Sequence, residues 1–244
     1  MRFQNWLLAL FLTAAASSLT LAQQAIPDDS AYEYSSDWTT PHTKLWMRHL
    51  ARFSNKPDVH GLEIGCFEGR SSIWFLERIA SHPTARMTCI DVFTEAIEKR
   101  FDHNLRVSGL SERMIKRKGY SQDVLRTLAS QTFDFVYIDG CHLASCVLTD
   151  AVLAWDLLRP GGMIIFDDYL WELEKPKTQR PKLAIDTFVA IFHDELRVRA
   201  KAYQVIVEKK GKRAEKVLIG EPVVHTQGWE ERYQQKKKEA RENH

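Results

Sequence analysis

The chain has 244 residues, a formal net charge of +2, 44% hydrophobic residues and 27% charged residues. This composition is typical of a soluble domain of about 150 to 250 residues, and it excludes a collagen-like or low-complexity chain. Because affinity for nucleic acid comes from many uncompensated Lys and Arg side chains, the near-neutral balance also argues against nucleic acid as a partner.

An apolar segment lies near the N-terminus. Residues 6–21 carry no charge, and Thr20-Leu21-Ala22 supplies small residues of the kind preferred at a signal-peptide cleavage site. We therefore expect residues 1–22 to be a signal peptide or an attached apolar leader, and the protein to be exported; a cytoplasmic protein is the alternative. The segment is shorter than the about 20 apolar residues of a membrane span, so membrane contact is expected only through an uncleaved leader.

Residues 23–57 are predicted to be a lead-in followed by a helix. The polar composition of residues 23–40 predicts a loosely ordered segment. Thr40 can cap the helix that follows, with Pro41 at its first position.

Short β-rich runs alternate with helical stretches from residue 58 onward. The predicted strands are 59–64, 87–90, 114–118, 133–138 and 162–166, and the predicted helices are 71–81, 95–105, 122–130, 143–158 and 182–193. This alternation predicts a doubly wound α/β domain over residues 58–220 with a mostly parallel sheet. The runs at 203–207 and 217–219 predict a C-terminal antiparallel hairpin, and residues 221–244 are expected to form a charged, solvated tail.

The four cysteines, Cys66, Cys89, Cys141 and Cys146, have neither C-x-x-C spacing nor the His partners of a zinc site. We expect four reduced and mostly buried thiols. Free thiols suit a reducing compartment better than an exported protein, so this expectation conflicts with the predicted leader.

Glycines and carboxylates follow the first two predicted strands, where ligands of open α/β sheets bind. Residues 63–71 read E-I-G-C-F-E-G-R-S, in which Gly65 and Gly69 allow a tight turn ahead of a helix N-terminus. This spacing is not the G-x-G-x-x-G of a dinucleotide site. Asp91 follows the second strand and can accept hydrogen bonds from ribose hydroxyls. Each feature alone could be an ordinary turn or cap; together they favour a ligand that contains a nucleoside.

Three more carboxylates follow the fourth and fifth predicted strands: Asp139, Asp167 and Asp168. Carboxylates that converge on one cleft raise one another's pKa and cost stability unless a cation is present. Oxygen ligands of this kind suit Mg²⁺. The alternative is that they serve only as turn and cap residues.

His142 lies three residues after Asp139. An imidazole with an ordinary pKa near 6.5 can accept a proton at neutral pH, which makes His142 a candidate general base. The alternative is a surface histidine that caps the following helix. The other eight histidines are expected to be structural or exposed.

These residues resemble the class I S-adenosylmethionine-dependent methyltransferases. More narrowly, they resemble the small metal-dependent O-methyltransferases, which include catechol-type and macrocin-type sugar enzymes. The resemblance runs from about residue 58 to 169 and more loosely to about 207. It implies that four residues hold the methionine part of the cofactor, that Asp91 holds its ribose, and that Ser121 and Gln122 contact its adenine. The four residues are Glu63, Gly65, Gly69 and Ser71.

The resemblance also implies a metal site at Asp139, Asp167 and Asp168, with an Asp-Asp pair in place of the Asp-Asn pair of the catechol enzyme. His142 stands where catechol-type enzymes have a lysine base and macrocin-type enzymes a histidine. The expected activity is therefore Mg²⁺-dependent methylation of a hydroxyl on a sugar-containing or phenolic small molecule. Aromatic side chains are expected to form the acceptor walls: Tyr32, Tyr34, Trp38, Trp46 and Trp171.

Two other classes stay open. A nicotinamide-dependent oxidoreductase would use the same architecture, but the glycine spacing disfavours it and it does not need three clustered carboxylates. A non-catalytic exported binding module is favoured only by the leader.

Overall fold

The computed structural model describes residues 29–211. The predicted leader (1–22), the start of the lead-in (23–28), the predicted strand at 217–219 and the charged tail (221–244) lie outside the described residues. Within residues 29–211, none of the helices combines the length and the apolar character that a membrane crossing requires.

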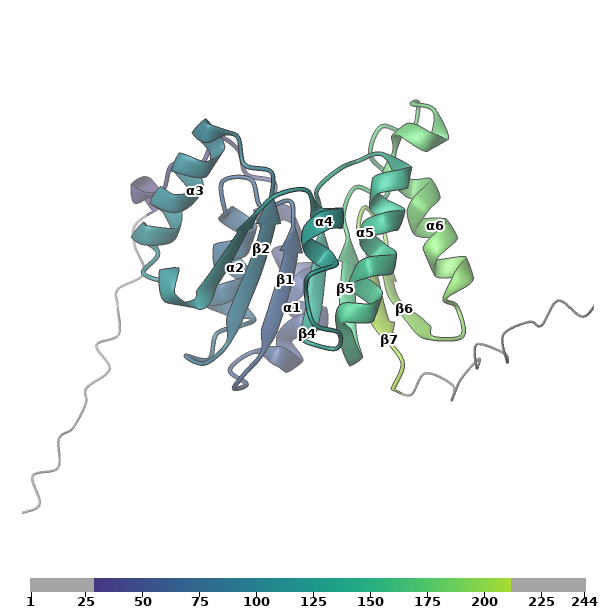
Figure 1. The fold of residues 1–244 in the computed structure, drawn as a ribbon, viewed down its shortest axis with the longest axis horizontal. Coiled ribbons are helices and arrows are strands. Elements are labelled where there is room, and N and C mark those ends of the chain that lie inside the picture. The colour runs from purple at the N-terminus through teal and green to yellow at the C-terminus, as the bar shows by residue number, and fades with distance from the viewer. Residues whose placement is uncertain (1–28, 212–244) are drawn as a thin grey trace, which may run out of the picture.

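The strands form a seven-stranded sheet in the order β3-β2-β1-β4-β5-β7-β6 (Figure 1). The strands are β1 (His60–Ile64), β2 (Arg86–Asp91), β3 (Met114–Lys118), β4 (Phe133–Ile138), β5 (Leu158–Phe166), β6 (Leu196–Lys201) and β7 (Val205–Lys209). Strands β1 to β5 pair in parallel, whereas β7 runs antiparallel to both β5 and β6. The predicted α/β fold class is confirmed.

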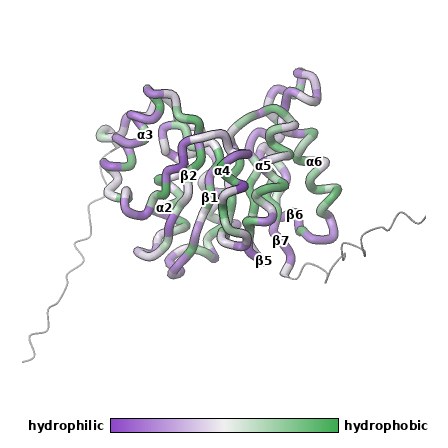
Figure 2. The backbone as a smooth tube through the Cα atoms, viewed as in Figure 1, coloured by the Kyte–Doolittle hydropathy of each residue, from purple (hydrophilic) through white to green (hydrophobic). Residues whose placement is uncertain are grey.

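Helices cover both faces of the sheet (Figure 1). They are α1 (Thr43–Leu50), α2 (Arg70–Arg78), α3 (Glu95–Val107), α4 (Ser121–Leu125), α5 (Ala144–Leu157) and α6 (Pro181–Ile191). One core lies between the sheet and α4, α5 and α6, and a second lies between the sheet and α1 and α2. The central strands β1, β2 and β4 are mostly buried. Figure 2 shows hydrophobic stretches within the sheet, whereas much of α3 is hydrophilic.

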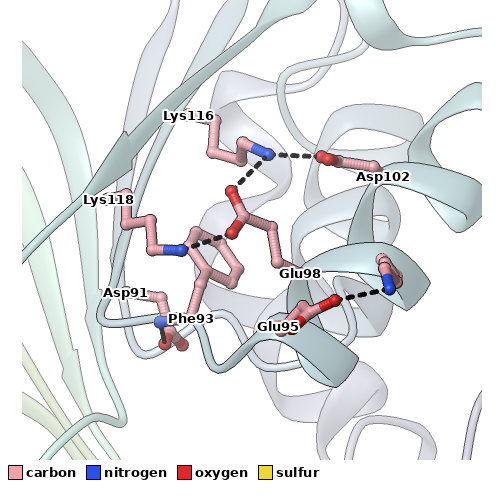
Figure 3. Close-up of polar contacts among 8 residues, drawn as sticks. Asp91, Phe93, Glu95, Glu98, Asp102, Lys116 and Lys118 are labelled. Atoms are coloured by element: carbon pink, nitrogen blue, oxygen red, sulfur yellow. Dashed lines mark hydrogen bonds and ion pairs between the residues drawn. The ribbon is translucent and has the colours of Figure 1, made fainter.

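Strand β3 forms one edge of the sheet and carries basic side chains. Lys116 Nζ binds Asp102 Oδ1 at 2.6 Å and Glu98 Oε1 at 3.1 Å, and Lys118 Nζ binds Glu98 Oε2 at 2.5 Å (Figure 3). These pairs fasten α3 beside the end of β2, where Asp91 lies. The charges on this edge also disfavour pairing with a strand of another chain.

The C-terminal hairpin differs from the prediction. Its strands are Leu196–Lys201 and Val205–Lys209, so the predicted first strand at 203–207 overlaps the second strand of the hairpin. Strand β6 is an exposed edge with the polar sequence L-R-V-R-A-K, which lacks the apolar signal of a strand.

The prediction of four reduced cysteines is wrong, because Cys66 and Cys89 form a disulfide. Glu63 of β1 lies opposite Cys89 of β2, and the loop after β1 turns back over β2. This brings the two Cα atoms to 6.1 Å, within the usual range for a disulfide. Cys141 and Cys146 are free.

The lead-in is ordered from residue 29, contrary to the prediction of a loose segment. Asp37 Oδ1 accepts hydrogen bonds from the backbone N–H groups of Thr40 (2.9 Å) and Thr39 (3.2 Å). Thr40 and Pro41 lie in a short 3₁₀ turn that precedes α1, so Asp37 caps this entry in place of the predicted Thr40.

Candidate active site

A cavity of about 1010 Å³ opens at the carboxyl ends of the parallel strands. The predicted site residues line it, except Glu63 and Gly69, which lie behind its wall. We call the part formed by the loops after β1, β2 and β3 the cofactor half. The part formed by the loops after β4 and β5 and by the turn between β6 and β7 is the reaction half.

The loop between β1 and α2 forms the floor of the cofactor half. Gly65 has a φ of +86°, and a Cβ there would lie 2.1 Å from the backbone oxygen of Asp139. Gly69 has a φ of +84° and precedes α2, where a Cβ would lie 2.9 Å from the Phe101 ring. Both positions therefore require glycine, and Gly65 joins the two halves of the cavity.

Glu63 supports this loop from inside the protein. Its side chain is fully buried, and it accepts hydrogen bonds from the Ser71 hydroxyl at 2.5 Å and from the Ser72 hydroxyl. Burial raises the pKa of Glu63 to about 7, against the opposing effect of the two hydroxyls. Glu63 therefore positions the start of α2, whereas Ser71 itself reaches the cavity.

Asp91 ends β2 and faces the cavity. Its Oδ2 accepts backbone hydrogen bonds from Cys66 (2.8 Å) and Phe67 (3.0 Å), and its Oδ1 accepts one from Phe93 (2.9 Å). A carboxylate has about four acceptor sites, so lone pairs stay available to a bound diol. Asp91 thus fixes the loop after β1 and offers an acceptor at the predicted ribose position.

Ser121 and Gln122 begin α4 at the far end of the cofactor half. Gly119 precedes them with a φ of +154°, which lets the chain turn sharply after β3. The Ser121 hydroxyl donates to Asp150 Oδ1 of α5 at 2.7 Å.

Three aspartates converge in the reaction half, as the sequence predicted. Asp167 Oδ1 accepts the backbone N–H of Asp168 at 2.7 Å, and Asp167 Oδ2 accepts from Gln204 at 3.0 Å. The buried Tyr137 hydroxyl lies between Asp139 Oδ2, at 3.0 Å, and Asp167 Oδ2. Burial, followed by the charges of its two aspartate neighbours, raises the pKa of Asp139 well above its ordinary value.

Asp168 also has a raised pKa. Burial and the charge of Asp167 raise its pKa, although the Tyr203 hydroxyl donates to Asp168 Oδ1 at 2.8 Å. Asp168 has a φ of +58°, which is uncommon for a residue with a side chain and is typical of functional sites.

His142 reaches the same point. Its Nε2 lies 3.0 Å from Asp168 Oδ2 and 4.0 Å from Asp139 Oδ1, and its ring meets the Trp171 ring edge-on at 4.6 Å. Within the described residues, one ligand atom from each of Asp139, His142 and Asp168 lies within 4.8 Å of the others. An oxygen-rich set with raised carboxyl pKa values fits a hard divalent cation such as Mg²⁺.

A strap, residues 31–42, lines the cavity; the sequence predicted aromatic wall residues in this segment, but not the hydrogen bonds that hold it against the domain. The backbone N–H of Glu33 donates to Asn104 Oδ1, and that of Ser35 donates to Glu68 Oε2, each at 2.6 Å. Asp37 then pairs with Arg70 at 3.1 Å. Of the predicted wall residues, Tyr34, Trp38 and Trp171 line the cavity, whereas Trp46 is fully buried and Tyr32 is not at its wall.

His42, at the end of the strap, corrects the expectation that no histidine other than His142 belongs to the site. Its ring stacks on that of Tyr203 at 5.8 Å, and its charge acts on Asp168. No sequence signal marked His42 or Tyr203 as site residues, because they lie 161 positions apart in the sequence and meet only in the fold.

Comparisons with known proteins agree with this architecture. Residues 62–169 match a family model described as a methyltransferase domain. The chain is 29% identical over 127 residues to an uncharacterized protein of Acanthamoeba polyphaga mimivirus, covering 50% of this chain and 57% of that one. It is also 29% identical over 154 residues to a putative O-methyltransferase of Mycobacterium sp. (strain JLS), covering 59% of this chain and 66% of that one. The chain thus spans less than two thirds of each relative.

Solved structures share the fold. An O-methyltransferase from Bacillus cereus in complex with S-adenosylhomocysteine has a TM-score of 0.58 at 21% identity, with 76% of this chain and 93% of that chain covered. MycE, from the mycinamycin pathway, in complex with Mg, S-adenosylhomocysteine and mycinamycin VI, has a TM-score of 0.52 at 18% identity, with 74% and 52% covered.

The domain match over residues 62–169 and the shared fold agree with the resemblance to class I S-adenosylmethionine-dependent methyltransferases that the sequence shows.

Proposed function

We propose that the protein transfers a methyl group from S-adenosylmethionine to a hydroxyl of a small molecule, with the help of Mg²⁺. The observation that carries the proposal is the junction at Gly65, where the cofactor loop touches the backbone of Asp139. The predicted donor site and the cluster of Asp139, His142 and Asp168 therefore share one cavity. Two reactants held in such proximity gain effective molarities of about 10⁵ M or more.

The cation would be held by Asp139 and Asp168, whose oxygens face His142, with Asp167 behind them. Both Asp167 oxygens accept hydrogen bonds from protein groups. Asp167 would therefore offer the cation its negative charge and the lone pairs that these bonds leave unused. A divalent cation at this point supplies acidification of a bound hydroxyl. Tyr137 and Gln204 hold the carboxylates in place.

His142 is proposed to take the proton of the acceptor hydroxyl at Nε2. Asp168 Oδ2, 3.0 Å away, would stabilise the imidazolium that results. The same geometry favours a second role, in which Nε2 is a metal ligand, because one potential ligand atom from each of Asp139, His142 and Asp168 lies within 4.8 Å of the other two. The two roles differ in one property: a base can be removed without loss of Mg²⁺ affinity, whereas a ligand cannot.

The acceptor is proposed to be a sugar-containing or phenolic molecule. Trp38, His42 and Trp171 line the cavity, with His42 beside Tyr203 and Trp171 beside His142 in the reaction half. Aromatic faces suit either kind of ring. The cavity volume of about 1010 Å³ lies at the upper end of the about 300–1,000 Å³ typical of small-molecule sites, which suits the binding of donor and acceptor together.

The test is a methyl-transfer assay with labelled S-adenosylmethionine over a panel of glycosides and phenols, with and without Mg²⁺. We expect label in at least one acceptor class and loss of transfer in excess chelator. If S-adenosylhomocysteine fails to bind the purified protein, the proposal is wrong at its first step. Reduction of a nicotinamide cofactor by the same panel would favour the oxidoreductase alternative instead.

We also propose that the protein is exported. The Cys66–Cys89 disulfide supports this, because disulfides persist mainly in oxidising compartments. N-terminal sequencing of protein from its native host should find a start near Gln23. An intact Met1 on soluble cytosolic protein with reduced Cys66 and Cys89 would contradict export.

A further inference from the structure

A buried carboxylate lies behind the wall of the cofactor half and has no part in the mechanism above. Asp150, on α5, is only 1% exposed. Its Oδ1 accepts the Ser121 hydroxyl at 2.7 Å, and its Oδ2 has no hydrogen-bond partner among residues 29–211. The Ser121 hydroxyl therefore supplies the hydrogen bond that stabilises this buried carboxylate. Ser121 also lines the cavity.

The bond to Asp150 decides what Ser121 can offer to a ligand. A serine hydroxyl has one proton and two lone pairs, and an ionised carboxylate can only accept. When Ser121 donates its proton to Asp150, its oxygen can present only lone pairs to the cavity. A ligand group that meets Ser121 must then be a hydrogen-bond donor.

We infer that Asp150 is a positioning residue, which holds the Ser121 hydroxyl as a hydrogen-bond acceptor toward the cavity. The site would therefore bind a 6-amino purine in preference to a 6-oxo purine. This inference rests on the proposed function. The exocyclic amino group is the N–H donor of an N9-substituted adenine, whereas its ring nitrogens only accept. A 6-oxo purine presents a carbonyl oxygen at the same place, and two acceptors would then face each other.

The charge state of Asp150 supports this assignment. Burial raises the pKa of Asp150 to about 6, and the Ser121 hydroxyl opposes that rise, so the carboxylate is mainly ionised at pH 7.5. The Cys146 thiol, one turn earlier on α5, is neutral at this pH, because burial, the neighbouring Cys141 and the Asp150 charge raise its pKa to about 11. Below pH 6, a protonated Asp150 could donate to Ser121 and release the serine proton toward the ligand.

The experiment compares S-adenosylhomocysteine with its 6-oxo analogue, S-inosylhomocysteine, by calorimetry at pH 7.5. The wild type should bind the amino form about 5- to 100-fold more tightly, the range expected when one buried acceptor loses its donor. In Asp150→Asn the ratio should fall to within about twofold of unity, because an amide N–H can donate to Ser121 and free its hydroxyl to donate in turn. The ratio in the wild type should also fall as the pH drops through about 6.

Asp156→Asn is the matched control, since it makes the same chemical change at an exposed position of the same helix and should keep the wild-type ratio. If Asp150→Asn does not fold, as judged by thermal unfolding, Ser121→Ala tests the same point and should abolish the preference. Two results would overturn the inference but leave the proposed function intact. The first is equal affinity of the wild type for S-adenosylhomocysteine and S-inosylhomocysteine. The second is an unchanged ratio of these two affinities in Asp150→Asn or Ser121→Ala. Binding of neither ligand would overturn the proposed function, and the inference with it.

Discussion

The two halves of the cavity treat their carboxylates in opposite ways. In the cofactor half, Asp91 accepts three backbone N–H groups, and Glu68 accepts the Ser35 N–H and pairs with Arg100 at 2.5 Å. These hydrogen bonds and the Arg100 charge outweigh burial and lower the pKa of Glu68. The charges of Asp91 and Glu68, which both line the cavity, are thus matched by protein groups.

In the reaction half the charges are not matched. Burial and the neighbouring aspartates raise the pKa values of Asp139 and Asp168, although His142 and His42 act on Asp168 in the opposite direction. The side chains that donate hydrogen bonds to the three carboxylates, Tyr137, Gln204 and Tyr203, are neutral. Crowded buried carboxylates are costly unless a cation compensates them. This difference between the cavity-lining carboxylates supports the proposal that the reaction half holds a cation.

The largest effect should come from Asp139→Asn, which keeps the shape of the side chain but removes a central charge. We expect turnover to fall by about 10⁴-fold, since a divalent cation supplies several kcal/mol of catalysis. Affinity for S-adenosylhomocysteine should stay within about threefold of the wild type, because Gly65 touches only the backbone of Asp139. Labelled methyl transfer and calorimetry measure the two quantities, and a parallel loss of both would show that the halves are not separate.

His142→Ala should reduce turnover by about 10²- to 10⁴-fold, the usual worth of a general base. Residual activity should climb with pH as hydroxide replaces the imidazole, and calorimetric Mg²⁺ affinity should be unchanged. A variant that loses Mg²⁺ affinity would instead identify His142 as a ligand. Unaltered turnover and pH profile would remove His142 from the mechanism.

Gly65→Ala should disturb the point where the halves meet. The added Cβ would lie 2.1 Å from the Asp139 oxygen at a φ of +86°, so the loop must shift. Strain of this kind costs about 1–3 kcal/mol, and we expect cofactor affinity to fall by about 10- to 100-fold in calorimetry. Gly161→Ala is a control for positive φ alone, because its φ is +80° but a Cβ there meets nothing within 4 Å. Equal affinities in the two variants would contradict the close contact.

Glu68→Gln should have the smallest effect, because it loosens the strap without touching the reacting groups. Loss of the charged bonds to Ser35 and Arg100 should raise the acceptor KM by about three- to tenfold with little change in kcat. Glu98→Gln is a suitable control, since Glu98 binds Lys116 and Lys118 away from the strap (Figure 3). A drop in kcat with an unchanged KM would place Glu68 in the chemistry and contradict its role in the wall.

The sequence identified the parts of the site that lie directly after buried strands. Gly65, Asp91, Asp139 and Asp168 follow apolar runs, and parallel strands bring their carboxyl ends to one edge. These local signals were enough for the fold class and for the aspartate cluster.

Features that depend on contacts between distant segments were not predictable in this way. The strap is polar and docks through backbone N–H groups onto Asn104 and Glu68, so it carries no apolar periodicity. The Cys66–Cys89 bond depends on the register of β1 against β2, which cysteine spacing does not reveal. His42 meets Tyr203 across 161 positions of sequence for the same reason.

The most direct test of the difference between the halves is a single preparation measured before and after removal of divalent cations. The account predicts that S-adenosylhomocysteine affinity stays within about twofold, while methyl transfer falls by at least about 10²-fold and returns on addition of Mg²⁺. Full methyl transfer in excess chelator, or loss of S-adenosylhomocysteine binding together with the cation, would contradict it.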